Sequence, residues 1–438
     1  MSGEAGAAQP TGKVPIQSGG RGRWVKLFSS AVIDQAALSA ANFLVGLLLI
    51  RHTSDADYGH YVLGFTTLLL LTGMQGAYIG GPLSVLAPRK SPEQKRLMLA
   101  TLYKQSGRWI SRIGFALAAL SAALGVAGLI TPLYAVLAAV YSATAATALN
   151  REYLRTGLMI YERPQAVLRA DLVYVALLVA GAAAAAYLAK PAAPWTFAAM
   201  AVAALVGGVM ARRALAGDPG LGGDELPGLW RELAPLGAWA MAGCIIHWSF
   251  SQGYNYVVAA TLDLSAVAAI NATRLLMMPA NLMVSGIKQL LLPMAARWND
   301  QLGLDPMLRR LVLFAGVVTL LHLIYFAALW VFRDWVFVEL LRKPVEQRDQ
   351  MLVLWMAVFL IACVRDLCMT AILVRQKFRS MTWLTSIAAV VALASCWLGM
   401  QVYGVAGAIT GLLLGEAINL IGVALLIARE RRAAAAGA

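Results

Sequence analysis

Composition and charge place the chain among membrane proteins. Of its 438 residues, 60% are hydrophobic and only 13% are charged, and the mean hydropathy is +0.70. These values exclude a soluble enzyme or a soluble binding domain, because soluble domains carry about 25% charged residues. The formal net charge of +14 is therefore attributed to orientation in the bilayer and contact with anionic lipid, and nucleic-acid binding is not expected.

The beginning of the chain differs from the rest. Residues 1–23 open with "MSGEAGAAQPTGKVPIQSGG", which is polar and rich in Gly, Ala and Pro, and too long and weakly charged for a signal peptide. We interpret it as a disordered cytoplasmic tail. The four cysteines lie within apolar runs, where they are expected to pack as small hydrophobic side chains. No metal, redox or nucleotide-binding motif is visible, so no cofactor is expected.

Apolar runs long enough to cross a bilayer recur along the chain. A membrane core of about 30 Å needs roughly 20 apolar residues per helix. The pattern predicts an all-α membrane protein with about twelve transmembrane helices. The predicted spans are residues 27–50, 61–87, 109–130, 132–149, 167–188, 194–215, 236–260, 266–294, 310–332, 350–374, 382–400 and 404–428.

The chain also repeats itself. "REYLRTGLMIYERPQAV" from Arg151 aligns without a gap on "RDLCMTAILVRQKFRSM" from Arg365, and a second register matches Asp55 to Asp263. Two lobes of six helices with equal orientation are therefore expected, with the substrate path between them. The predicted boundaries are an N-lobe at 24–215, a cytoplasmic linker at 216–233, a C-lobe at 234–430 and a C-terminal tail at 431–438.

The predicted span 266–294 contains two cations, Arg274 and Lys288. A cation at membrane depth survives only inside a bundle or in a wet cavity. On a continuous helix the two residues would lie within roughly 40° of one face, about 21 Å apart. A pyrophosphate group is a fitting counterpart, since guanidinium binds phosphate bidentately. Alternatively, Arg274 pairs with an interior acid such as Asp34 or Glu416 only to hold the lobes together, and Lys288 snorkels to the interface.

Two sequence motifs carry a resemblance to a known superfamily. "RLLMMP", followed fourteen residues after its proline by the last proline of "LLLP", resembles the eighth helix of the lipid II flippases. "LLLIRHTSDADYGHYVLG" resembles the "aR.lg..dyG.y" pattern of polysaccharide flippases (Wzx-type), which belong to the polysaccharide transporter family. Both groups are in the multidrug/oligosaccharidyl-lipid/polysaccharide exporter superfamily. The resemblance implies two lobes in a V, a cationic central cavity, alternating access, and a headgroup contact for Arg274.

Other polar residues within predicted spans form three sets. The seventh span offers a stripe that suits sugar hydroxyls or, equally, interhelical hydrogen bonds. Deep acids are candidates for ion coupling, and adjacent cation–acid pairs are interpreted as gate or packing pairs, each side chain pairing with another helix. The stripe comprises His247, Gln252, Tyr254 and Asn255; the coupling acids are Asp34 and Glu416; the adjacent pairs are Arg151–Glu152 and Arg365–Asp366.

These observations favour a non-enzymatic flippase of the bacterial inner membrane. Its expected substrate is an undecaprenyl-pyrophosphate-linked oligosaccharide, and its expected setting is polysaccharide export beside a polymerase and the export machinery, as a monomer within the lipid bilayer. A cation-coupled multidrug exporter of the same superfamily remains the alternative. A membrane polymerase or ligase is less favoured, because the longest outward loop, residues 333–349, carries no His or Cys.

The distribution of Lys and Arg generates a topological prediction. Of the 36 cations, 28 fall on the side that holds both termini, six fall on the other, and two lie within a span. Because positive loops stay cytoplasmic, we expect reporter fusions after Lys90 and Gly220 to report cytoplasm. Fusions near Lys190 and Val402 should report periplasm, and a cytoplasmic Lys190 would contradict the twelve-helix layout.

Overall fold

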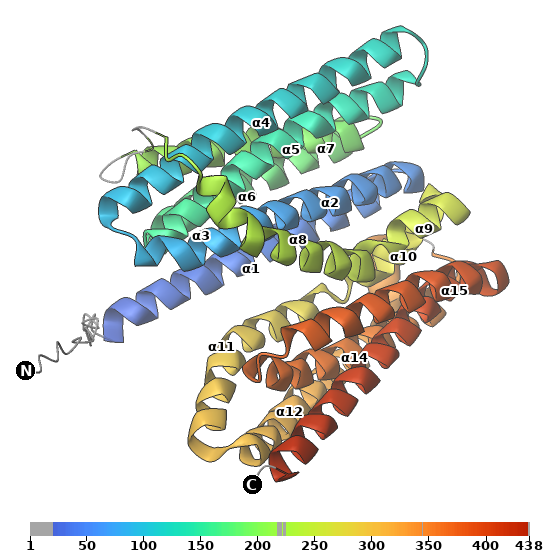
Figure 1. The fold of residues 1–438 in the computed structure, drawn as a ribbon. Helices are drawn as coiled ribbons and strands as arrows, with labels where there is room; N and C mark the ends of the chain where they lie inside the picture. Colours follow the sequence, from blue (N-terminus) through green and yellow to red (C-terminus); the bar gives the residue numbers. More distant parts are fainter. Residues whose placement is uncertain (1–20, 217–220, 222–224, 344, 437–438) are drawn as a thin grey trace, which may run out of the picture.

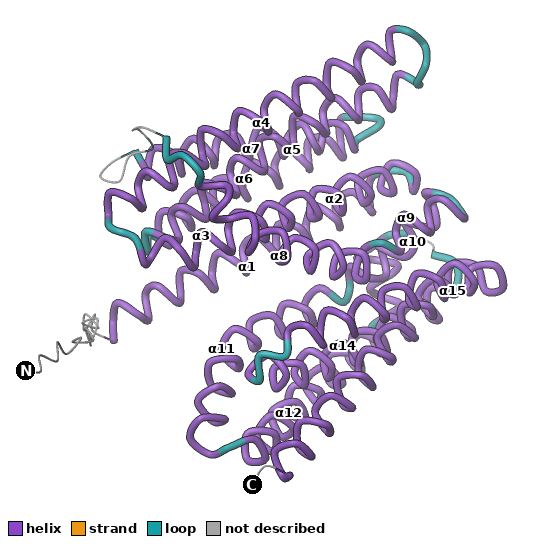
Figure 2. The backbone as a smooth tube through the Cα atoms, viewed as in Figure 1, coloured by secondary structure: helices purple, strands orange, loops and turns teal. Residues whose placement is uncertain are grey.

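The structure is a computed structural model that describes residues 21–216, 221, 225–343 and 345–436. Within these residues all regular structure is helical, as Figure 2 shows, which confirms the all-α prediction. The first half comprises α1 (Arg21–His52), α2 (Asp55–Gln75), η1 (Gly76–Gly80), α3 (Gly81–Leu86), η2 (Ala87–Arg89), α4 (Pro92–Val126), α5 (Pro132–Ile160), α6 (Pro164–Leu188) and α7 (Ala193–Leu215). The second half comprises α8 (Leu229–Gln252), α9 (Tyr254–Thr261), α10 (Leu264–Leu275), α11 (Met278–Leu302), α12 (Leu304–Val331), α13 (Arg333–Trp335), η3 (Val336–Leu341), α14 (Arg348–Val374) and α15 (Phe378–Ala436).

The predicted tails and linker lie partly outside the described residues. Residues 1–20, 217–220, 222–224 and 437–438 belong to this part of the chain. The described remainder differs from the prediction at both ends, because α1 already begins at Arg21 and α15 continues to Ala436. The domain boundaries drawn from the sequence stay a prediction.

The helix count agrees with about twelve membrane crossings. Ten described helices are long and apolar enough to span a bilayer, and α10 with α11 forms one further, bent span. The 59-residue α15 is two helices that meet at Gly404, where φ is 54° and ψ is −134°. Only glycine adopts such a conformation readily. The predicted spans 382–400 and 404–428 are thus the two arms of a hairpin, and the chain is a multi-pass membrane protein.

The helices form two bundles (Figure 1). Helices α1 to α7 make the N-terminal bundle and α9 to α15 make the C-terminal bundle, and α8 lies between them. The first half of α8 packs on the π-helical segment η1, where Trp230 stacks on Tyr78 with ring centroids 6.2 Å apart. Its second half packs on α15, where Phe250 approaches Gly415. Helix α8 therefore contacts both bundles.

The bundles meet at the end of the molecule opposite to the start of α1 and the end of α15. We call this the far end, and the opposite one the terminal end. Helix α2 packs closely on α10 at the far end, where a Cβ atom on Gly59 would lie 2.5 Å from the carbonyl oxygen of Leu264. Gly59, the glycine of the "DYGHY" motif, lies inside α2 and permits this close helix contact.

Backbone geometry supports the gapless repeat. Glu162 and Gln376 occupy equivalent positions in the alignment that starts at Arg151 and Arg365, and both have left-handed backbones with φ of 55° and 57°. The nitrogen of Glu162 donates to Met159 O, and that of Gln376 donates to Leu373 O, each at 2.9 Å. Such capping turns end helices that carry the same sequence pattern.

The second register is shifted by one position in the structure. Ser54 caps α2 by accepting a hydrogen bond from the nitrogen of Asp57, and Asp263 caps α10 by accepting one from Ala266. Ser54 is therefore the structural counterpart of Asp263, in place of the predicted Asp55. The sequence alignment matched Asp with Asp, but either Ser or Asp can serve as the N-cap residue of a helix, so identity of the residue did not indicate the equivalent position.

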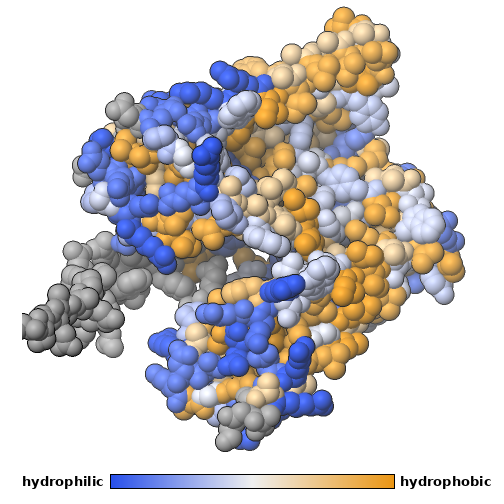
Figure 3. All heavy atoms as spheres, viewed as in Figure 1, coloured by the Kyte–Doolittle hydropathy of each residue, from blue (hydrophilic) through white to orange (hydrophobic). Residues whose placement is uncertain are grey.

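The surface has the polarity of a membrane protein. Hydrophilic residues gather at the terminal end of both bundles and hydrophobic residues cover much of the remaining face in view (Figure 3). Many large apolar side chains are exposed, for example Phe115 at 79% and Val390 at 69%. Exposed apolar side chains over such lengths are stable only in lipid.

Candidate functional site

A break in the predicted span 266–294 positions Arg274. The sequence suggested one continuous helix, but α10 ends at Leu275 and α11 begins at Met278, and the two are bent by 57°. Pro279 lies in the first turn of α11, where its missing N–H costs nothing. The hydroxyl of Tyr325 donates to the carbonyl of Leu276 at 2.6 Å, which satisfies a backbone group freed by the break.

Arg274 faces two cavities. One, of about 350 Å³, lies within the C-terminal bundle; the other, of about 240 Å³, lies between the bundles against α1 and α2. Four residues line both cavities: Gln252, Arg274, Asn281 and Phe359. The larger cavity is also lined by His247, Phe250, Ser285, Lys288, His322, Arg365, Asp366 and Glu416. The smaller one is also lined by Asn42, Tyr58, Tyr61, Thr66 and Asn271.

The guanidinium of Arg274 retains free donors. Its Nη1 donates to Gln252 Oε1 at 3.2 Å, and its carbon lies 5.9 Å from the ring of Tyr254 and 5.8 Å from that of Trp355. Arg274 makes no ion pair with any described residue. The acids considered as partners are engaged elsewhere, because Asp34 pairs with Arg155 and Glu416 with Arg365.

Lys288 and Arg365 share carboxylates on the wall of the larger cavity. Lys288 Nζ lies 2.9 Å from Asp366 Oδ2, and Arg365 lies 3.1 Å from both Asp366 Oδ1 and Glu416 Oε2. The sequence suggested that Arg365 and Asp366 splay apart. Asp366 does reach α11, but it also contacts its neighbour Arg365, because both side chains turn into the cavity. Counting Arg274, the wall carries three cations and two acids.

The polar stripe predicted on the seventh span is divided by the structure. His247 and Gln252 line the larger cavity at the end of α8. Tyr254 and Asn255 follow the break at Gly253 and are buried, with exposed fractions of 1% and 0%. Asn255 accepts a hydrogen bond from Asn271 at 2.6 Å, so these two residues support the cavity wall from behind.

A second charged cluster lies inside the N-terminal bundle. Arg155 Nε donates to Asp171 Oδ2 at 2.8 Å, and the same guanidinium contacts Asp34 from α1. Arg151 also pairs with Asp171, and its guanidinium lies 3.8 Å from the ring of Tyr174. The cluster therefore joins α1, α5 and α6.

Glu152 behaves differently from the prediction, because among the described residues its ion pair is with Arg155 of its own helix, at 3.4 Å. Arg155 was overlooked in the sequence. Its position four residues after Arg151 places both on one helix face and was the available signal.

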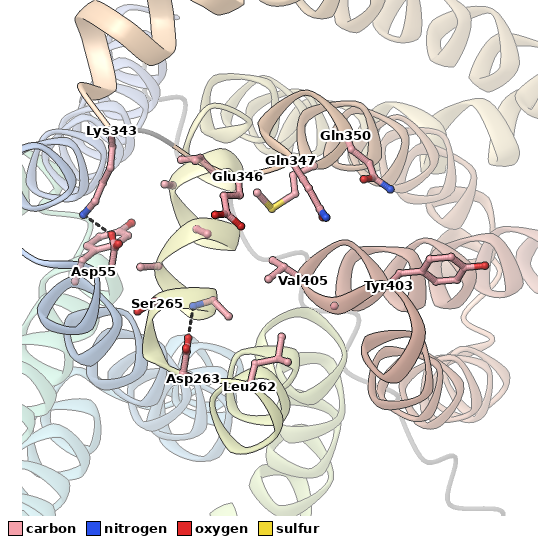
Figure 4. Close-up of a pocket in the computed structure, with 18 of the residues that line it drawn as sticks. Asp55, Leu262, Asp263, Ser265, Lys343, Glu346, Gln347, Gln350, Tyr403 and Val405 are labelled. Atoms are coloured by element: carbon pink, nitrogen blue, oxygen red, sulfur yellow. Dashed lines mark hydrogen bonds and ion pairs between the residues drawn. The ribbon is translucent and has the colours of Figure 1, made fainter.

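The far end carries a third cavity, of about 750 Å³ (Figure 4). Lys343, before α14, pairs with Asp55 at the start of α2 at 2.5 Å and donates to the carbonyl of Thr53 at 3.2 Å. Glu346 and Gln347 extend into the cavity in this view. The ion pair joins the two bundles outside the contact between α2 and α10. Tyr58 lines both this cavity and the smaller central one.

Comparisons with solved structures establish the fold. An inward-facing multidrug resistance MATE family transporter of the MOP superfamily superposes with a TM-score of 0.72 at 12% identity, covering 92% of this chain and 98% of that one. The lipid II flippase MurJ, in an inward closed conformation, gives 0.69 at 10% identity, with coverages of 92% and 87%. An outward-facing MATE transporter gives 0.64 at 13% identity, with coverages of 95% and 96%.

The chain shares its fold with these MATE transporters and with MurJ. At these identities the comparison shows the fold alone. No protein-family model matches the chain, and no curated protein matches its sequence. These neighbours are described as transporters and a flippase.

The buried cluster of the N-terminal bundle generates a stability prediction. Asp171→Asn removes the charge that two arginines share, and leaving a buried cation without its partner costs about 3–5 kcal/mol. We expect a clear fall in the thermal unfolding midpoint of the detergent-purified protein. Asp305→Asn is the control. The side chains of Asp305 and Arg431 form an ion pair and are each 58% exposed, so this pair contributes less than about 1 kcal/mol to stability. Equal midpoints for the two variants would contradict the structural role of Asp171.

Proposed function

We propose that the protein is a flippase that moves an undecaprenyl-pyrophosphate-linked oligosaccharide from the cytoplasmic to the periplasmic leaflet of the bacterial inner membrane. It serves polysaccharide biosynthesis or exopolysaccharide export by alternating access, as a monomer that operates with a polymerase and export machinery. The headgroup binds Arg274 and Lys288, and His247 and Gln252 bind the sugar nearest to it.

One observation carries this proposal: Arg274 stands at the junction of two cavities without an ion-pair partner among the described residues. An unpaired cation at membrane depth costs about 2.5–3.5 kcal/mol, so its retention favours an anionic ligand. The guanidinium keeps donors directed at open space, and a phosphate takes two of them at once. Gln252 and the rings of Tyr254 and Trp355 hold the guanidinium in place.

The carboxylates of the larger cavity support an anionic substrate in a second way. Asp366 is within ion-pair distance of two cations, Lys288 and Arg365, and Glu416 pairs with Arg365. The larger cavity has three cationic side chains and two carboxylates, so an entering ligand meets a net charge of one positive unit. A pyrophosphate can also draw Lys288 away from Asp366, since the ammonium is a mobile point charge on a flexible stem.

The arrangement of the bundles supports alternating access. They are joined at the far end by α2 against α10 and by the pair Lys343–Asp55. The central cavities lie on the terminal side of this closure. A conformation closed at the far end agrees with the TM-scores, which are higher for the inward-facing MATE transporter than for the outward-facing one.

A cation-coupled multidrug exporter is the second candidate. The specific observation in its favour is the superposition on the MATE transporter, which matches 98% of that chain and has the higher TM-score of the two superfamily branches. An organic cation requires an acid that is not already neutralised in the cavity. Drug susceptibility and polysaccharide export, measured in the same strain, separate the two candidates.

Arg274 provides the direct test. We expect activity to fall in the order arginine, lysine, alanine, because lysine keeps the charge and loses the planar fork. A hydrogen bond to a charged group contributes about 1.5–3 kcal/mol. Its loss in Arg274→Ala corresponds to a reduction of transport by about 10-fold to 150-fold. The measurement is complementation of polysaccharide export in a flippase-deficient strain, with membrane abundance determined by immunoblot.

Arg297→Ala is the matched control for this series. Arg297 lies in α11 on the exposed surface, and its one side-chain hydrogen bond to the described residues is with the carbonyl of Pro293 of its own helix, at 3.4 Å. We expect its export to equal that of the parent. Full export by an abundant Arg274→Ala protein would refute the headgroup role. Loss of the protein from the membrane would show that Arg274 holds the fold.

The coupling acids generate a separate prediction. We assign proton coupling to Glu416, which lines the larger cavity, rather than to Asp34, which lines none of the three cavities and is enclosed by the N-terminal cluster. Glu416→Gln should leave substrate binding intact and make transport independent of pH, because the amide cannot carry a proton. The control is Asp34→Asn, whose transport should keep the parental pH profile. Unchanged pH dependence in Glu416→Gln would leave this acid as a structural partner of Arg365.

A further inference from the structure

A groove on the N-terminal bundle lies outside the path described above. Helix α5 packs against both α4 and α7, and these three helices enclose a volume of about 340 Å³. None of its lining residues belongs to the three cavities of the candidate site. It is lined by Tyr103, Ser111, Gly114, Phe115, Ala118, Ala143, Ala146, Thr147, Asn150, Arg151, Leu154, Ala204, Leu205, Gly208, Val209 and Arg212.

Most of the groove is apolar and open to lipid. Phe115, Leu205 and Val209 are exposed by 79%, 56% and 41%, and small residues from α4 and α5 lie between them. Along α4 the lining extends from Tyr103 to Ala118, which is about 22 Å at 1.5 Å per residue. This exceeds half of a bilayer core about 30 Å thick, so the groove has the length and direction of an acyl chain in one leaflet.

One end of the groove is polar and positively charged. Arg212, in the last turn of α7, is exposed, and its guanidinium lies 5.8 Å from the ring of Tyr103. It forms no ion pair within the described part of the chain. Asn150 and Arg151 of α5 line the same groove, and Arg151 Nε is buried without a hydrogen-bond partner among the described residues. These groups lie toward the terminal end of α5 and α7, where the sequence predicts the cytoplasmic leaflet.

We propose that this groove is a binding site for an anionic phospholipid. One acyl chain lies along α4 against Phe115, Leu205 and Val209, and the phosphate contacts Arg212 with Asn150 beside it. Charge selects the headgroup, because each basic residue near the surface contributes about 1 kcal/mol toward an anionic lipid. The groove supplies contacts that a smooth helix surface lacks. The site is independent of the transported substrate.

Adjacent arginines give a matched test. Arg212 lines the groove, whereas Arg213 is also exposed and does not line it. The full-length protein, purified in detergent, is titrated with phosphatidylglycerol or phosphatidylcholine, and bound lipid is counted by native mass spectrometry. We expect Arg212→Ala to weaken phosphatidylglycerol binding about fivefold, Arg213→Ala to change it less than about twofold, and Arg212→Lys to retain most of it.

A second variant tests the acyl-chain part. Ala143 is exposed within the groove, so Ala143→Phe fills the space without touching the cation and should weaken the binding of both lipids. Equal losses in Arg212→Ala and Arg213→Ala would overturn the proposal in favour of a diffuse positive surface. Equal parental affinities for the two lipids would also overturn it. If Ala143→Phe fails to accumulate, the comparison of the two arginines decides alone.

Discussion

A charged side chain within the bilayer must meet an opposite charge or open water, and this requirement organises both bundles. Arg151, Arg155 and Arg365 meet it through carboxylates from other helices. These pairs join consecutive helices, α5 to α6 and α14 to α15, and the contact of Arg155 with Asp34 also joins α5 to α1, which is distant in sequence. Arg274 has no ion-pair partner among the described residues, and it lines both the cavity between the bundles and the cavity within the C-terminal bundle.

The second constraint is the backbone. A helix that breaks inside a membrane frees carbonyl and amide groups that lipid cannot satisfy. Tyr325 satisfies one such carbonyl at the break between α10 and α11, and the indole of Trp355 donates to Ile270 O at 3.2 Å just before it. The break turns Arg274 from a residue on a straight helix into one at the last turn of α10. Trp355 thus both bonds the backbone of α10 and lies beside the guanidinium of Arg274.

Hydrogen bonds also tie α8 and α9 to the N-terminal bundle. Trp248 donates to the carbonyl of Thr66 at 2.9 Å, and Tyr256 donates to that of Leu63 at 3.0 Å. These bonds span the boundary that the repeat placed between the halves. Because α8 also packs on α15, a movement of the bundles relative to each other must bend α8 or break these bonds. Gly253, between α8 and α9, stands where such a bend requires least change.

Hydropathy predicted the helices well because each crossing needs its own apolar run. The repeat was visible because the turns around Glu162 and Gln376 require the same sequence pattern. The partner of each charge was not predictable, since ion pairs such as Arg155–Asp34 and Lys343–Asp55 depend on how helices pack. The break after Leu275 was also missed, because a proline in the sequence does not show whether a helix begins there or continues. Pro279 lies in the first turn of α11, whereas Pro293 lies inside α11 without ending it. Arg274 could be proposed from the sequence as a site residue because the free-energy cost of an arginine in lipid depends on that one residue.

Under the proposed function, the charges along the path suggest how release occurs. The central cavities present an excess of positive charge at Arg274, whereas the far cavity carries Asp55, Asp263 and Glu346 against Lys343. A phosphate is therefore attracted to the centre and disfavoured at the exit. A sugar is an uncharged hydrogen-bonding group and is accepted by carboxylates and by Gln347 alike. Opening of the far end then requires that Lys343 leave Asp55, which adds negative charge to the exit at the moment the glycan passes.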